Sequence, residues 1–139
     1  MSKQLPHCRH WHRLAGFLLC IAATGCHQPT DHDLIGNWEV NYEDSKLKLT
    51  LNPDRTFAQV VEPKGKDVVR RNGRWELADL EGPCVVLNGA LVLRDEKGNG
   101  TVEPVGGNGA WIMHIESGIT GTRLPVNEDL GLYFDKVGK

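Results

Sequence analysis

The chain has 139 residues, with 16 Lys and Arg against 18 Asp and Glu, which gives a formal net charge of −2. This length suits one domain of modest size with a single hydrophobic core. The mildly acidic balance argues against a protein whose main partner is nucleic acid.

The first 25 residues have the three-part layout of a secretory signal peptide. Residues 1–13 contain no acid and three basic residues, Lys3, Arg9 and Arg13. Residues 14–23 are mostly apolar, and about ten residues are too few for a helix that crosses a bilayer core of about 30 Å. We therefore predict that residues 1–25 are a signal peptide.

The signal ends in the run Ala23-Thr24-Gly25-Cys26, which resembles the lipobox of bacterial lipoproteins. The resemblance implies cleavage between Gly25 and Cys26, a diacylglyceryl group on the Cys26 thiol, and acylation of the new amine by a chain such as palmitate. Several acyl chains make a stable membrane anchor. The next residue is His27 rather than Asp, which favours the outer over the inner membrane, so we expect a lipid-anchored protein that faces the periplasm. The alternative is a chance cysteine after an ordinary secretory signal.

Cleavage would remove Cys8 and Cys20 and leave Cys26 acylated, so that Cys84 would be the one free thiol. We therefore expect no intramolecular disulfide. Cys84 begins the apolar run Cys84-Val85-Val86-Leu87, which predicts a buried strand residue rather than a reactive thiol. The cleaved chain would carry 13 basic and 18 acidic residues, a net charge near −5.

After the predicted signal, every tryptophan closes a Gly-x-Trp motif: Gly36-Asn37-Trp38, Gly73-Arg74-Trp75 and Gly109-Ala110-Trp111. Successive tryptophans are 37 and 36 residues apart, which indicates a degenerate repeat. Each motif opens a segment with period-two alternation, which is typical of a half-buried strand. The residues expected on the same face as their tryptophan are Val40 and Tyr42, then Leu77, then Met113 and Ile115.

The segments between these motifs also predict short strands and tight turns. Leu47, Leu49 and Leu51 alternate with polar residues, and Asn52-Pro53-Asp54-Arg55 is typical of a turn before a strand over 56–62. The last strand is expected over 130–137, and its inward residues would be Leu130, Leu132 and Phe134. Asn-Gly pairs, the strongest short-range hairpin signal, occur at 72–73, 88–89, 99–100 and 108–109.

After the signal, no window of about 11 residues has convincing helical periodicity. We therefore predict an all-β fold, a small antiparallel meander β-barrel of about eight to ten short strands, because closure hides strand edges. Residues 26–33 would tether the barrel to the lipid, and residues 34–139 would form the barrel domain. Within it, residues 96–108 predict a Gly-rich mobile loop.

The run Leu34-Ile35-Gly36-Asn37-Trp38-Glu39-Val40 resembles the first strand of lipocalin-like proteins, in which Gly-x-Trp closes the base of the barrel. Residues 49–57 and 73–77 also resemble small bacterial lipocalin-like lipoproteins of unassigned function. The resemblance covers residues 34–95 and is weaker over 130–137. The chain is short for a true lipocalin and has no predicted C-terminal helix, so the resemblance implies a fold more than a function.

No group of residues predicts a metal or cofactor site. His27, Asp31, His32 and Asp33 could gather a metal ion, but a flexible tether gives them no fixed geometry. Residues 95–100 faintly resemble a calcium loop. Lys97 takes a ligand position, and Gly106 stands where the bidentate acid should be, so we reject a calcium site there.

The sequence also predicts no catalytic site, so we do not expect an enzyme. His114 falls on the strand face opposite Trp111 and is interpreted as an ordinary strand histidine. Ser45 and Ser117 lie near turns without the partner signature of a nucleophile. A carboxylate pair for glycoside hydrolysis is not suggested by any motif.

Two binding roles follow from this reading. The barrel could hold a small apolar or amphipathic ligand, with the tryptophans lining a pocket. Alternatively the tryptophans plug the barrel, as expected for a domain that fills itself with its own side chains. The protein would then bind an envelope protein or act as an inhibitor subunit. Its contacts would be the 96–108 loop and a basic hairpin that contains Lys64, Lys66, Arg70, Arg71 and Arg74.

Overall fold

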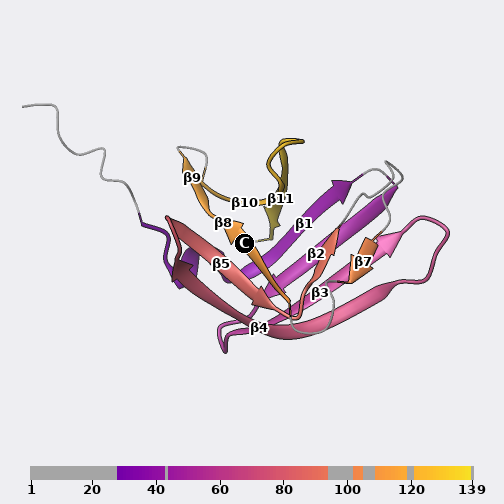
Figure 1. Ribbon diagram of the computed structural model, residues 1–139, viewed down its shortest axis with the longest axis horizontal. Helices are drawn as coiled ribbons and strands as arrows, with labels where there is room; N and C mark the ends of the chain where they lie inside the picture. The colour runs from indigo at the N-terminus through magenta and orange to yellow at the C-terminus, as the bar shows by residue number, and fades with distance from the viewer. Residues whose placement is uncertain (1–27, 43, 94–101, 105–108, 119–120, 139) are drawn as a thin grey trace, which may run out of the picture.

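The structure is a computed structural model that describes residues 28–42, 44–93, 102–104, 109–118 and 121–138. Nine antiparallel strands form one sheet that curls into a nearly closed barrel (Figure 1). The predicted all-β meander barrel is therefore confirmed. The elements in chain order are α1 (Asp31–Leu34), β1 (Gly36–Tyr42), β2 (Ser45–Leu51), β3 (Thr56–Pro63), β4 (Val69–Asp79), β5 (Pro83–Asn88), β6 (Leu91–Leu93), β7 (Val102–Pro104), β8 (Ala110–His114), β9 (Glu116–Gly118), β10 (Gly121–Asn127) and β11 (Leu132–Val137).

The strands follow one another around the sheet almost in chain order. The order is β8-β5-β4-β3-β2-β1-β11-β10-β9, so the last strand returns to pair with the first. β6 and β7 interrupt the meander because they form a separate two-stranded hairpin. This hairpin corrects part of the predicted 96–108 loop, because residues 102–104 form β7; the rest of that loop lies outside the described residues.

The barrel has one seam at which the described strands do not pair, between β8 and β10. The two strands lie against each other, but Pro125 in β10 has no N–H to donate to a ladder. Side chains close the seam instead. The ring of Trp111 on β8 packs against the ring of Phe134 on β11, with centroids 6.1 Å apart. Contact between β8 and β10, together with this ring packing, therefore brings the two ends of the sheet together without a described ladder.

Alternating burial along the strands places the core inside the barrel. The predicted inner faces are confirmed for β1, β2 and β8, on which Trp38, Leu49 and Trp111 are buried with their same-face neighbours. Burial of each large apolar side chain contributes about 1.5–3 kcal/mol to folding. The other large side chains that are almost fully buried are Leu34, Leu47, Leu51, Phe57, Trp75, Leu87, Leu91, Met113, Leu124 and Phe134.

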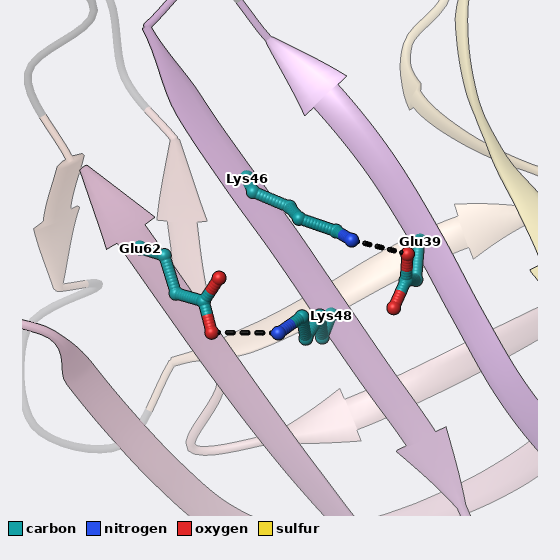
Figure 2. Close-up of polar contacts among 4 residues, drawn as sticks. All are labelled: Glu39, Lys46, Lys48 and Glu62. Atoms are coloured by element: carbon teal, nitrogen blue, oxygen red, sulfur yellow. Dashed lines mark hydrogen bonds and ion pairs between the residues drawn. The ribbon is translucent and has the colours of Figure 1, made fainter. Parts of the chain in front are cut away.

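The outer face of β1 and β2 is polar, and two ion pairs connect the outer faces of β1, β2 and β3 (Figure 2). Lys46 Nζ lies 2.6 Å from Glu39 Oε2, and Lys48 Nζ lies 2.7 Å from Glu62 Oε1. In the strand register Glu39 is opposite Lys48, and Lys46 is opposite Glu62, so both ion pairs run diagonally. A one-residue slip would turn these charges toward the core, and the polar face therefore helps to fix the register.

The Asn72-Gly73 pair does not form a hairpin turn, so that prediction is wrong. Both residues lie inside β4, where Gly73 is opposite Phe57 of β3. A β-carbon on Gly73 would lie 2.6 Å from Phe57 Cε1 and 2.3 Å from the carbonyl oxygen of Asn88. Close packing of neighbouring strands, rather than a turn, therefore requires this glycine.

The other Asn-Gly pairs have different outcomes. Asn88 ends β5, and Gly89 lies in a turn with a φ of +83°. The hairpin prediction is wrong here as well, because β5 pairs with β4 and β8 and not with β6. The pair at 99–100 lies outside the described residues, as does Asn108 of the pair at 108–109.

The last strand begins later than predicted. β11 starts at Leu132, and Leu130 lies in the preceding turn with 61% of its surface exposed. The Leu130 N–H donates to Asn127 Oδ1 at 3.2 Å, and Gly131 takes a φ of +61°. These local turn contacts outweigh the apolar alternation that suggested an earlier start.

We predict that Gly73→Ala destabilises the protein by about 1–3 kcal/mol, because the new methyl group must displace Phe57 or the β5 backbone. Chemical denaturation of the full chain measures the change in the free energy of unfolding. Gly118→Ala is the matched control, because a β-carbon there meets nothing within 4 Å. Equal stability of the two variants would contradict the packing role of Gly73.

We also predict that Lys48→Met raises the pKa of Glu62 toward its ordinary value of 4.5. The hydrogen bond from Lys48 lowers the pKa of this carboxyl in the folded protein. This contact therefore stabilises the fold above the unfolded-state pKa, and the contribution is lost as pH falls through the lower, folded-state pKa. A carboxyl NMR titration measures the pKa, and Lys66→Met should leave it unchanged. An unchanged pKa in Lys48→Met would contradict the assignment.

Candidate functional site

The base of the barrel is built around Trp38. Its indole Nε1–H donates to the carbonyl oxygen of Leu34 in α1 at 2.8 Å. Lys136 of β11 lies over the Trp38 ring, with Nζ 5.2 Å from the centroid, and the same Nζ donates to the Asp33 carbonyl oxygen at 2.7 Å. The first strand, the last strand and the helix therefore meet at one buried side chain, with its polar atom satisfied.

Trp75 repeats this arrangement on β4. Its Nε1–H donates to the carbonyl oxygen of Asn52 at 3.0 Å, in the turn between β2 and β3. The Arg55 guanidinium lies over the Trp75 ring, 4.5 Å from its centroid, and pairs with the Asp31 carboxylate of α1. The predicted turn at 52–55 is confirmed, and it connects the second tryptophan to the helix.

The C-terminal part of the predicted tether is folded against the barrel. Thr30 and Asp33 form a capping box around α1: the Thr30 N–H and hydroxyl donate to Asp33 Oδ2 at 2.8 and 2.7 Å. Leu34 is fully buried, and Asp31 is paired with Arg55. The sequence reading missed this helical turn because one turn is too short for apolar periodicity, although Thr30 with an acid three residues later was a usable signal.

A hydrogen-bonded glutamine fixes the β6–β7 hairpin to the barrel interior. Gln59 of β3 is fully buried, and its Nε2–H donates to the Leu91 carbonyl oxygen at 2.9 Å. The Leu91 N–H donates back to Gln59 Oε1 at 2.7 Å. The side-chain amide therefore pairs with Leu91 as a strand residue would. No buried side-chain nitrogen or oxygen in the described part of the chain lacks a partner.

These contacts fill the middle of the barrel with the protein's own side chains. Trp38, Trp75 and Trp111 belong to one continuous core, together with Leu91 from the hairpin. The arrangement favours the interpretation of the tryptophans as a plug. Gly36 has a φ of +136° ahead of the first tryptophan, and Gly73 provides close packing ahead of the second.

A cleft of about 610 Å³ that is open to solvent lies between α1, the β9–β10 hairpin and β11. It brings together three residues that were considered from the sequence, namely His32, Asp33 and Ser117. Arg123 and Lys136 add positive charge, and Phe134 contributes an apolar floor.

The remaining candidates from the sequence are dispersed. His114 is exposed on β8, Ser45 is buried at the start of β2, and Cys84 is a buried free thiol in β5. No three His, Cys, Asp or Glu side chains gather as a metal site in the part of the chain that the structure describes. Gly25, Cys26 and His27, and the rejected calcium segment 95–100, lie outside it.

The basic hairpin is exposed at the opposite end of β3 from α1 (Figure 1). Lys64 and Lys66 lie in the β3–β4 turn, and Arg70, Arg71 and Arg74 follow on β4. Lys64 Nζ is 3.4 Å from Asp44 Oδ1, but both side chains are more than three-quarters exposed. Exposed pairs of this kind contribute little stability, so the basic residues are available to a partner.

Comparison with known proteins gave no match among protein-family models, curated proteins or solved structures. Within the described residues, no helix has the length and apolar character needed to cross a membrane.

We predict that Gln59→Met destabilises the protein by about 2–4 kcal/mol, because it leaves the buried N–H and C=O of Leu91 without partners. Thr50→Val is the control, because it removes only the exposed bond from Thr50 Oγ1 to Asn37 Oδ1 and should cost less than about 1 kcal/mol. Denaturant unfolding of both variants gives the comparison. A small effect of Gln59→Met would mean that the hairpin is not held by this pair.

Proposed function

We propose that this protein is a lipid-anchored cell-envelope lipoprotein whose non-catalytic, lipocalin-like barrel binds another envelope protein through its surface. The filled core is the observation that carries this proposal. Trp38, Trp75 and Trp111 occupy the barrel interior, and Gln59 holds Leu91 there as well. An occupied interior favours the outer surface as the place of recognition.

The proposed anchor would fix the orientation of the barrel relative to the membrane. Cys26 precedes α1 by five residues, which can span at most about 18 Å. The base of the barrel, with α1 and Trp38, would therefore lie close to the membrane. β3 rises about 26 Å over its length, so the basic β3–β4 hairpin at its far end would project into the periplasm.

A small amphipathic ligand is the second candidate, and the open cleft beside α1 favours it. The buried ring of Phe134 forms part of its floor, while Arg123 and Lys136 offer positive charge. A ligand with a short apolar part and an anionic group would suit these side chains.

We predict that the lipoprotein, cross-linked in its native envelope, yields a reproducible protein partner that copurifies under denaturing conditions. Cys26→Ser should abolish palmitate incorporation and reduce the cross-linked product, because the barrel loses its place at the membrane. Cys20→Ser is the matched control and should leave both unchanged. Absence of any cross-linked protein, together with a small molecule bound in native mass spectrometry of the lipoprotein, would favour the second candidate instead.

A further inference from the structure

β4 is longer than β5, the strand that pairs with one of its two edges. β3 pairs with β4 residues 69–74, whereas β5 pairs with residues 74–79 only. Residues 69–73 therefore have β3 on one side and no described strand on the other. Figure 1 shows β4 continuing past the end of β5 toward the β3–β4 turn. This edge is a template for a further strand.

The backbone groups that face this open edge can be identified. The Trp75 N–H donates to the Arg55 carbonyl oxygen at 2.9 Å, so the backbone N–H and C=O groups of Trp75 face the β3 side. Backbone direction alternates along a strand, and the register with β3 is regular through this part. Gly73 and Arg71 therefore face β3, whereas Arg70 and Asn72 present their N–H and C=O groups at the open edge.

Positive charge surrounds the open edge. Arg70 and Arg74 are opposite Val60 and Thr56, on the outer face, and Arg71 is opposite Gln59, on the inner face. All three arginines are exposed. Arg70 and Arg74 favour carboxylates on the outer face of any strand that pairs here.

The edge is also partly apolar. The acid on the neighbouring strand, Glu62, already has a partner. Val69, on the inner face, is 37% exposed, and the adjacent Val68 is 43% exposed. Glu62, on the neighbouring strand, already contacts Lys48.

The other strand edges are less suitable. β8 lies against β10, and the Trp111–Phe134 contact closes that seam. β9 spans only Glu116–Gly118 and carries an acid rather than a base. Compared with the edges at β8 and β9, the segment 69–73 combines length, exposure and positive charge.

We propose that an extended acidic segment of a partner protein adds to the barrel as a strand along residues 69–73 of β4. The inference rests on the proposed function and names the partner's chemistry. Main-chain hydrogen bonds to Arg70 and Asn72 would supply affinity, and alternating side chains would supply specificity. Acidic residues would face Arg70 and Arg74 on the outer side, and apolar residues would face Val69 on the inner side.

The direct test uses a synthetic peptide of about seven residues in which Glu alternates with Val, long enough for one strand. It is titrated against the full-length lipoprotein in detergent. The peptide should bind, and the same peptide with N-methylated backbone should not, because it has the same charge but cannot pair as a strand. Hydrogen exchange should slow at the amides of Arg70 and Asn72 when the peptide binds. The amides of Arg71 and Gly73, already bonded to β3, should be slow before binding.

Two substitutions locate the interaction. Asn72→Pro removes the N–H that faces the open edge, and proline is tolerated on edge strands; it should weaken binding by at least about tenfold. Arg70→Glu should weaken binding similarly, whereas Lys66→Glu, the same charge change in the adjacent turn, should alter it by less than about threefold. Arg70→Glu keeps the test valid if Asn72→Pro fails to fold.

The proposal is overturned if the N-methylated peptide binds as well as the parent, or if Arg70→Glu binds as well as Lys66→Glu. It is also overturned if no acidic peptide binds. Failure of this proposal is distinguishable from failure of the proposed function. An envelope protein that cross-links equally to the wild type and to Asn72→Pro would place the partner elsewhere on the barrel and leave the proposed function standing.

Discussion

Burial of the Trp38 indole with its N–H satisfied is the interaction on which the rest of the structure depends. An indole in an apolar core needs a carbonyl partner, and Leu34 provides one because α1 folds across the base of the barrel. Lys136 then covers the ring from the last strand and binds the carbonyl of Asp33. One side chain thereby joins the first strand, the last strand and the helix, which closes the sheet at the β1–β11 side.

The other features follow from closing a small barrel on a filled interior. Trp75 and Arg55 connect the β2–β3 turn to α1 through Asp31, and Gln59 draws the β6–β7 hairpin inside. Side chains occupy the interior of the barrel. The candidate binding features therefore lie on its surface, as an open cleft beside α1 and an exposed basic edge at the far end of β4. The two ends therefore differ: one is tightly connected, and at the other end residues 69–73 of β4 have no described strand on one side.

The predictions succeeded where a feature depends on neighbours in sequence. Alternation in β1, β2 and β8, and the turn at 52–55, are local patterns, and the structure confirms them. The prediction of a turn at Asn72-Gly73 was wrong because glycine is also needed where strands pack closely. At this position the close contact with Phe57 of β3 explains the glycine. The candidate cleft could not be predicted, because it combines residues near 32 with residues near 120 and 135 that meet only in the closed barrel.

The sequence by itself determined the all-β class, the inner faces of the main strands and the tight turn before β3, because period-two burial and turn chemistry act over a few residues. Only the tertiary structure decided that Gln59 holds Leu91, 32 residues away, and that Asp31 pairs with Arg55, 24 residues away. It also decided that β4 extends beyond β5, so that residues 69–73 have no described strand on that side. Such contacts depend on which strands, distant in sequence, become neighbours. The packing of the complete core determines this, so no local pattern in the sequence predicts it.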